Sequence, residues 1–317
     1  MDLDLKAQFE GTYNPFSPDI PLIIPYETKS LRETLKVLHF FLHLGEGIAI
    51  LIGEDGIGKT TILQRFAETL TDGYLAIPLS GFYEGEREFF KGILEKVGWK
   101  DTQFREGDLR EVIRETVIRL FEEKREIVLL IDDAEKLKYR NVLLLQYLSS
   151  IKFTLFRPFH IVLFGNLLFF NELTKKTMRE FVKNISVIHF VKPISLGEVP
   201  YYVNHRLNLS SSIFPEISRK AISLVFSYSG GNPSKLNAIL EKALFLAKEK
   251  SLNIINEKII EEVASPLIKS GTRKKERFQL ILLFLLCFSL FYIIWTITES
   301  PLGIFKLIRK ILEVMAI

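Results

Sequence analysis

The stretch that most constrains the fold is a short apolar run at residues 47–52, followed directly by GEDGIGKT at residues 53–60. This octapeptide fits the pattern G-x-x-x-x-G-K-[ST], and residues 61–70 continue with a helical pattern. In a strand, glycine loop and helix of this order, backbone N–H groups and the positive end of the helix converge where a polyphosphate can bind. The sequence therefore predicts an α/β protein with a phosphate-binding loop. A turn that only joins strand to helix is the alternative.

The motif assigns two side chains to a bound nucleotide. Lys59 is expected to reach the β- and γ-phosphates, and Thr60 is expected to offer its hydroxyl to Mg²⁺, because a hard divalent ion prefers oxygen ligands. ATP and Mg²⁺ are therefore the expected cofactors. The nucleotide-binding residues predicted from this loop and the start of its helix are Gly53, Glu54, Asp55, Gly56, Ile57, Gly58, Lys59, Thr60 and Thr61.

A second apolar run, at residues 127–131, ends in Asp132-Asp133-Ala134-Glu135. Five consecutive apolar residues predict a central parallel strand, and its acidic end would lie at the carboxyl edge, where open α/β sheets bind ligands. Asp132 is therefore the predicted protein carboxylate for Mg²⁺, beside the hydroxyl of Thr60.

Hydrolysis of a nucleotide also needs a group that orients the attacking water. Asp133 stands where a glutamate usually does this, but its side chain is one methylene shorter, and Glu135 is the alternative candidate. Asp133 could instead cap the helix that follows. Asn166, after the apolar run 160–164, is either a polar sensor beside the γ-phosphate or a turn residue after Gly165. The predicted catalytic residues are Lys59, Asp132, Asp133, Glu135 and Asn166.

Strands and helices alternate as far as residue 192, which predicts a three-layer αβα core, residues 46–192, around a parallel sheet. Residues 1–45 are expected to form an irregular strap and then a helix capped by Ser30, with Glu33 completing a capping box. The expected strands lie at residues 47–52, 74–79, 127–131, 160–164 and 185–191, and the helices between them at 61–70, 82–97, 109–123 and 142–149.

After Pro193 the pattern changes, and only helices are expected. Ser195 with Glu198 forms a predicted capping box at the first helix, and Gly230-Gly231 ends the second. Residues 193–268 are therefore predicted to form a small all-α lid domain. Its expected helices lie at residues 195–207, 216–229, 233–250 and 256–263.

The C-terminal part of the sequence predicts a membrane anchor. A basic linker at residues 269–277 precedes residues 278–297, which carry no charge and are long enough to cross a bilayer as one helix. A buried core helix or a hairpin in the membrane face is the alternative. By the positive-inside rule, the linker places the ATPase domain in the cytoplasm, on a single-pass inner-membrane protein. The short tail, residues 298–317, is expected to lie at the outer interface.

Composition narrows the function further. The 42 Lys and Arg against 38 Asp and Glu give a net charge of only +4. Nucleic-acid binding needs a face of clustered cations rather than a slight excess, so no nucleic-acid partner is expected. The single cysteine, Cys287, excludes an internal disulfide, and the five histidines show no metal-ligand spacing.

Several segments beyond the phosphate-binding loop follow one another in a specific order. They are NPF at 14–16, PLS at 78–80, IDDAE at 131–135, GN at 165–166, YVNHRL at 202–207 and SGGNPSKLN at 229–237. Their order resembles the AAA+ ATPases of the general secretion pathway A group. These are inner-membrane ATPases associated with assembly of the type II secretion secretin, and their relatives serve pilus and exopolysaccharide export systems.

The resemblance covers residues 12–265 and implies where the nucleotide binds. It implies that ATP lies between the core and the helical domain, with Pro15-Phe16 near the base and Lys235 beside the position of a nucleotide-binding arginine. It further implies a homo-oligomer, because a neighbouring subunit completes the site in this family.

This chain departs from the family pattern at three positions. Asp133 replaces a glutamate, Ser234 replaces the arginine after Pro233, and Asn184 stands where an arginine reaches the γ-phosphate of a neighbouring subunit. Arg179 and Lys183 are nearby cations. Lys235 follows Ser234, but lysine offers a point charge rather than the planar fork of arginine.

These features predict a membrane-anchored AAA+ ATPase that couples nucleotide-driven domain motion to an envelope assembly in secretion, pilus formation or polysaccharide export. Envelope assembly proteins are its expected partners, and ATP hydrolysis its expected reaction, with atypical catalytic positions. Those atypical positions favour an alternative, a nucleotide-binding switch or scaffold with little hydrolysis. A DNA-handling AAA+ ATPase of the initiator or transposition-helper type is a third hypothesis.

Overall fold

The computed structural model describes residues 14–17, 25–45, 47–71, 73–80, 85–99, 109–152, 158–210 and 214–265. The elements of the first half are α2 (Lys29–Leu44), β1 (Ile48–Ile52), α3 (Lys59–Thr69), β2 (Tyr74–Ser80), α4 (Glu86–Lys96), α5 (Leu109–Glu122), β3 (Glu126–Asp132) and η3 (Ala134–Lys136). Then follow α6 (Tyr139–Ser150), β4 (Phe159–Gly165), α7 (Leu167–Leu173), η4 (Lys176–Met178), α8 (Arg179–Val182) and β5 (Ile185–Phe190). The chain continues through α9 (Val199–Asn208), β6 (Glu216–Ile217), α10 (Arg219–Ser229), α11 (Pro233–Glu249) and β7 (Ile254–Ile255).

A five-stranded sheet forms the centre of the fold, with strand order β2-β3-β4-β1-β5 and every neighbouring pair parallel. All residues of β1 and β4 are buried, as expected for continuous apolar runs in a sheet covered on both faces. The prediction of a P-loop α/β fold around a parallel sheet is confirmed. Because all five strands point the same way, their carboxyl ends meet at one edge.

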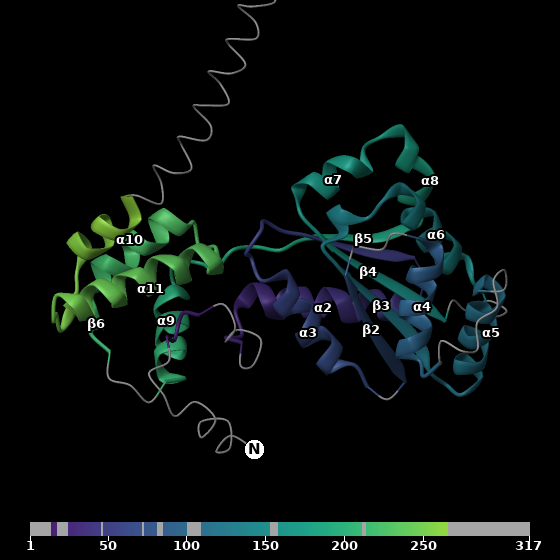
Figure 1. Ribbon diagram of the computed structural model, residues 1–317, viewed down its shortest axis with the longest axis horizontal. Helices are drawn as coiled ribbons and strands as arrows, with labels where there is room; N and C mark the ends of the chain where they lie inside the picture. Colours follow the sequence, from purple (N-terminus) through teal and green to yellow (C-terminus); the bar gives the residue numbers. More distant parts are fainter. Residues whose placement is uncertain are drawn as a thin grey trace, which may run out of the picture. The chain divides into compact units, whose positions relative to one another are not determined.

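Helices cover both faces of the sheet (Figure 1), and an apolar cluster packs between the helices and the sheet on each face. One cluster packs α4, α5 and α6 against one face, with Phe89 and Leu145 fully buried. The other packs α2 and α3 against the opposite face, with Phe41 and Phe66 fully buried. Burying each such side chain stabilises the fold by about 1.5–3 kcal/mol, so the sheet is a rigid base for the loops at its edges.

The start of α2 differs from the prediction. The helix is capped by Thr28, whose Oγ1 accepts the N–H of Leu31 at 3.0 Å, and not by Ser30. The side chain of Ser30 instead accepts the N–H of Lys192 at 3.1 Å. The prediction failed because Thr28 and Ser30 are both good caps, and only the tertiary contact with residue 192 distinguishes them.

The part of the chain after β5 is mainly helical, but its first two helices start later than predicted. Glu216 and Ile217, predicted as helix, form the two-residue strand β6, which pairs in parallel with β7. The second helix starts later, after Ser218, which accepts the N–H of Ala221 at 3.1 Å. The first helix after β5, α9, begins at Val199 rather than near Ser195.

The predicted capping box before α9 exists in altered form. The carboxylate of Glu198 accepts the hydroxyl of Ser195 at 2.6 Å, and it also accepts the backbone N–H of Lys29 at 2.7 Å. Burial works to raise the pKa of Glu198, but the hydrogen bonds from Ser195 and Lys29 outweigh it and lower the pKa below its usual value. Glu198 therefore joins the start of α2 to the segment before α9.

Within the ranges that the structure describes, no helix combines the length and apolar character needed to span a bilayer. The predicted linker, span and tail, residues 269–317, lie outside those ranges.

Candidate functional site

The phosphate-binding loop connects β1 to α3 at the carboxyl edge of the sheet. Gly58, with φ of 101°, precedes the first helical residue, Lys59, in a conformation that favours glycine. The side chain of Lys59 is buried, and its Nζ donates to the carbonyl oxygens of Gly53 at 2.9 Å and Glu54 at 3.2 Å. Its Nζ also lies 3.6 Å from Oδ1 of Asp55. The loop therefore encloses a lysine whose donors are held by backbone oxygens.

Thr60 and Asp132 meet across the sheet edge, although 72 residues separate them. The hydroxyl of Thr60, in the first turn of α3, donates to Oδ2 of Asp132 at 2.6 Å. Asp132 is the last residue of β3, and its other oxygen accepts the N–H of Asp133 at 3.0 Å. A hydroxyl and a carboxylate in contact form the kind of oxygen donor set that Mg²⁺ prefers, so these residues fit the ion.

Asp133 adopts a left-handed backbone conformation, with φ of 51°, at the turn between β3 and η3. Its carboxylate accepts from Nζ of Lys136 at 2.6 Å, and it makes no capping bond to the following backbone. The ion pair raises the pKa of Lys136. The alternative that Asp133 acts as a side-chain helix cap is therefore wrong for this turn.

Glu135 lies in η3, three residues after Asp132, and lines the same pocket. One carboxylate oxygen, Oε2, is inaccessible to solvent and has no hydrogen-bond partner among the described residues. A buried oxygen without a donor is energetically costly, which gives it a reason to accept a bond from a bound molecule. The turn at Asp133 brings Glu135 to the pocket wall.

Asn166 serves two structural functions at the end of β4. Its Oδ1 caps α7 by accepting the N–H groups of Leu168 at 2.9 Å and Phe169 at 3.3 Å. Its Nδ2 donates to Oδ1 of Asp55, in the phosphate-binding loop, at 3.3 Å. Asn166 therefore lies beside the loop and also occupies the turn position proposed as the alternative.

The start of α11 contacts the phosphate-binding loop directly. Asn232, which caps α11, donates from Nδ2 to the carbonyl oxygen of Asp55 at 3.0 Å. The N–H of Ser234 donates to the carbonyl oxygen of Gly56 at 3.2 Å. Lys235 is more remote: its Nζ lies 3.6 Å from Oε2 of Glu54, and it does not line the pocket. The sequence predicted Lys235 and missed Asn232, although an asparagine before a proline is a recognised helix start.

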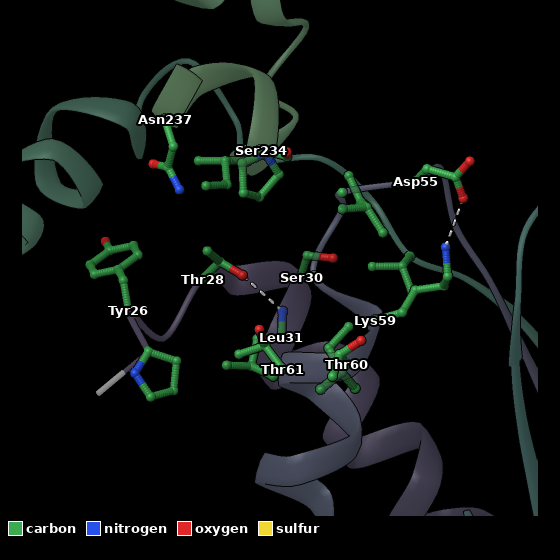
Figure 2. Close-up of a pocket in the computed structure, with 18 of the residues that line it drawn as sticks. Tyr26, Thr28, Ser30, Leu31, Asp55, Lys59, Thr60, Thr61, Ser234 and Asn237 are labelled. Atoms are coloured by element: carbon green, nitrogen blue, oxygen red, sulfur yellow. Dashed lines mark hydrogen bonds and ion pairs between the residues drawn. The ribbon is translucent and has the colours of Figure 1, made fainter. Parts of the chain in front are cut away.

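A pocket of about 740 Å³ opens at this edge, within the usual range for small-molecule sites. Figure 2 shows residues of three segments around it: Tyr26 and Thr28, the loop with Asp55 and Lys59, and α11 with Ser234 and Asn237. The predicted residues that line it are Asp55, Gly56, Ile57, Gly58, Lys59, Thr60, Thr61, Asp132, Asp133 and Glu135.

The far wall of the pocket is largely apolar and aromatic, and the sequence predicted only part of it. Phe16 is fully buried and lines the wall with Tyr26 and Tyr202, whose rings meet edge to face at 6.0 Å. Burial raises the pKa of both tyrosines, so their hydroxyl groups stay protonated. An apolar, aromatic wall together with a loop that carries the buried Lys59 fits a nucleotide, which has an aromatic base and a phosphate chain.

The segment 14–17 is attached to the helices after β5. Asn14 donates to Glu241 of α11 at 2.6 Å, and Nη2 of the buried Arg206, in α9, donates to the carbonyl oxygen of Ser17 at 2.8 Å. These contacts hold Phe16 in the wall. Arg206 carries no local motif that would reveal this function, because the contact spans 189 residues of sequence.

Asn184 stands where the resemblance implies an arginine that reaches a neighbouring subunit's nucleotide, so neither it nor the nearby cations are expected in this subunit's own pocket. Lys183 pairs with Glu180 at 2.8 Å, and Asn184 donates to the carbonyl oxygen of Glu180 at 3.1 Å. Neither residue, nor Arg179, lines the pocket.

Comparison with known proteins relates this geometry to a family. Residues 43–173 match the family model described as an AAA domain. The chain is 26% identical over 250 residues to general secretion pathway protein A of Aeromonas hydrophila, which covers 77% of this chain and 45% of that protein. The chain therefore spans less than half the length of this relative. The predicted resemblance to the general secretion pathway A group is confirmed.

Solved structures share the fold at low identity. The ORC2 protein of Aeropyrum pernix, in ADPNP and ADP complexes, has a TM-score of 0.59 at 14% identity and covers 81% of this chain and 72% of that chain. Drosophila ORC bound to DNA has a TM-score of 0.55 at 16% identity and covers 83% of this chain and 65% of that chain. These similarities support the fold alone.

Proposed function

Because the chain is an AAA-type P-loop protein similar to general secretion pathway protein A, we propose that it is an AAA+ ATPase that binds Mg-ATP in this pocket. The observation that carries the proposal is the contact of Thr60 with Asp132 at 2.6 Å, beside the buried Lys59. Phosphates would replace Gly53 and Glu54 as acceptors for Lys59, and the wall around Tyr26 would receive the base.

We assign the water-orienting function to Glu135 rather than Asp133. The carboxylate of Asp133 is paired with Lys136 at 2.6 Å, whereas Glu135 lines the pocket and its Oε2 has no donor among the described residues; a rotation of this side chain would bring Oε2 to the water. Mg²⁺ held at Thr60 and Asp132 would neutralise charge on the phosphates. Glu135 would then hold the water, and Asn166 would orient the loop through Asp55.

Phosphate release by the purified full chain tests the reaction. Wild-type protein should release phosphate only with Mg²⁺, and Lys59→Ala should abolish both nucleotide binding and release. Glu135→Gln should lower turnover roughly 100-fold without weakening binding, whereas Asp133→Asn should have a smaller effect. Equal losses for the two variants would contradict the assignment to Glu135.

The wider function rests on the sequence. We propose that residues 46–192 form the core and that the helices of residues 193–268 act as a lid whose motion is driven by the nucleotide. Residues 278–297 would anchor the protein in the inner membrane, with the ATPase domain in the cytoplasm. By analogy with the named relative, the motion would act on an envelope assembly, and the chain would self-associate.

Membrane fractionation tests the anchor. The full chain should pellet with membranes and enter the supernatant only with detergent. A chain truncated after residue 277 should lose this behaviour. Recovery of the full chain in the supernatant without detergent would overturn the proposed span.

Two alternatives have specific support. The pairing of Asp133 with Lys136 and the absence of an arginine at position 234 favour a nucleotide-binding switch with little hydrolysis. Binding without Mg²⁺-dependent phosphate release would establish it. The fold similarity to the DNA-bound Drosophila complex motivates a DNA-handling function. A salt-sensitive shift of labelled duplex DNA would support that function.

A further inference from the structure

The contact between α11 and the phosphate-binding loop depends mainly on one side chain. Asn232 is 2% exposed and uses both ends of its amide. Its Oδ1 accepts the N–H groups of Ser234 at 3.1 Å and Lys235 at 3.3 Å, and its Nδ2 donates to the carbonyl oxygen of Asp55 at 3.0 Å. The same residue therefore caps α11 and holds the loop.

The bond to Asp55 determines the orientation of a peptide group that lines the pocket. The peptide bond between Asp55 and Gly56 is planar, and in the trans form its carbonyl oxygen and N–H point in opposite directions. Holding the Asp55 oxygen toward α11 therefore points the N–H of Gly56 away from α11. Because loops of this type bind phosphate through backbone N–H groups, the direction of this N–H affects phosphate binding.

A glycine at position 56 allows the close approach of α11. Gly56 has φ of 78°, and a Cβ atom placed there would lie 2.4 Å from Cβ of Ser234. The G-x-x-x-x-G-K-[ST] pattern does not require glycine at this position. Gly56 also accepts the N–H of Ser234 at 3.2 Å, so two consecutive carbonyl groups of the loop are bound by the start of α11.

We infer that Asn232 is a positioning residue that keeps the phosphate-binding loop in its binding conformation only while the start of α11 is docked on it. The inference rests on the proposed binding of Mg-ATP. Displacing α11 would remove the donors from Asp55 and Gly56 and free their peptide groups to rotate. Nucleotide affinity and docking of α11 are then linked, and each strengthens the other by the same factor.

Asparagine can be replaced here by residues that keep the cap and lose the bond to the loop. Asn232→Asp keeps an oxygen that caps α11, since Asp and Asn are equivalent caps, but it has no donor for the Asp55 oxygen and faces that oxygen with a buried negative charge. Asn232→Ser also keeps a cap, and its side chain is too short to reach Asp55. Asn256→Asp is the matched control, because Asn256 caps the helix at 257–265 through Ile259 at 3.4 Å.

The experiment measures binding of a fluorescent ATP analogue with Mg²⁺ to the full chain, together with amide hydrogen exchange in the absence of nucleotide. We expect Asn232→Ser to bind roughly three- to tenfold more weakly, as loss of one hydrogen bond predicts, Asn232→Asp to bind at least as weakly because of its added charge, and Asn256→Asp to bind like wild type. Without nucleotide, exchange should be faster in peptides covering residues 53–58 for the Asn232 variants, while α11 stays protected.

The outcomes separate this inference from the proposed function. Wild-type affinity and wild-type exchange of the loop in both Asn232 variants would overturn the inference and leave the ATP site intact. If wild type binds the analogue no better than Lys59→Ala, the proposed function and the inference both fail. Should Asn232→Asp not fold, Asn232→Ser tests the same contact.

Discussion

The two ends of strand β3 carry carboxylate pairs of opposite character. At the carboxyl end, Asp132 accepts from the exposed hydroxyl of Thr60 at 2.6 Å, beside an open pocket. At the amino end, Glu126 accepts from Nε2 of the buried His160, also at 2.6 Å. The rings of Phe41 and Tyr74 pack edge-on against His160, each at 6.1 Å.

The pair at Asp132 belongs to the proposed ligand-binding site, whereas the pair of Glu126 with His160 contributes to the stability of the fold. Around Asp132, the neighbouring groups include donors and acceptors that a ligand can replace. Around His160, aromatic side chains from α2 and β2 close the site, so the pair with Glu126 satisfies one of the two ring nitrogens of His160 inside the core, Nε2. A parallel sheet places its ligand site at the carboxyl edge for the same reason: the loops there are free to vary while the rest of the sheet is packed.

The largest expected effect comes from changing the carboxyl end. Asp132→Asn keeps the shape but removes the charge that Mg²⁺ needs, so Mg²⁺-dependent phosphate release should fall by roughly 100-fold or more. The free energy of unfolding should change by less than about 1 kcal/mol, because Thr60 is exposed. Steady-state phosphate release and urea denaturation of the same preparation measure both quantities. Undiminished release would contradict the assignment of Asp132 to the metal.

A change at the amino end of β3 should lower the stability of the protein and leave nucleotide binding unchanged. Glu126→Ala leaves Nε2 of the buried His160 without its acceptor, which should lower the free energy of unfolding by about 1–3 kcal/mol. Affinity for nucleotide, measured on the folded protein, should be unchanged. Glu123→Ala, an exposed glutamate three residues earlier, is the control and should have little effect on either quantity. Weaker nucleotide binding in Glu126→Ala would show that the two ends are not independent.

Substitutions of Thr28 and Ser30, which both line the pocket, test which of the two residues caps α2. Its Oγ1 is engaged by the N–H of Leu31 at 3.0 Å, so Thr28→Ala should cost about 1 kcal/mol of stability. Ser30→Ala should cost about half as much, because Ser30 supports only the contact with Lys192. Urea denaturation of the two variants shows which substitution causes the larger loss of stability. The reverse order would restore Ser30 as the cap of α2.

The sequence was most informative where local chemistry decides the structure. The apolar runs at 47–52 and 127–131 predicted buried parallel strands, because a strand covered on both faces has to be apolar along its length. The glycine loop between β1 and α3 could likewise be predicted, because its sequence pattern is typical of one backbone conformation. These features alone predict that Lys59, Thr60 and Asp132 meet at one edge of the sheet.

Prediction failed where long-range contacts choose between equivalent local options. Thr28 and Ser30 are both competent caps, and Lys192 selects between them. Glu216 was predicted as helical because its pairing partner, β7, lies 38 residues away in the sequence. The left-handed backbone of Asp133, which turns Glu135 toward the pocket, has no sequence signature for a non-glycine residue. Such features depend on which segments pack together.

The smallest expected effect is a pH dependence at the edge strand β5, where it meets α2. Nε2 of His189 lies 3.1 Å from Oγ1 of Thr34. Since the hydroxyl of Thr34 already donates to the carbonyl oxygen of Ser30 at 2.8 Å, His189 must be the donor. Burial and the charge of Lys192 lower the pKa of His189 below its usual value of 6.5, against the opposing effect of Glu33.

A lowered pKa in the folded state means that the unfolded chain binds the proton more readily. The free energy of unfolding is therefore unaffected by His189 above about pH 7.5 and decreases as the pH falls through 6.5 toward the folded pKa. Urea denaturation at about pH 7.5 and about pH 5.5 should show a small loss in wild type and a smaller one in His189→Gln. If both proteins lose the same stability, the pKa of His189 does not differ between the folded and unfolded states, and the contact with Thr34 contributes only packing between α2 and β5.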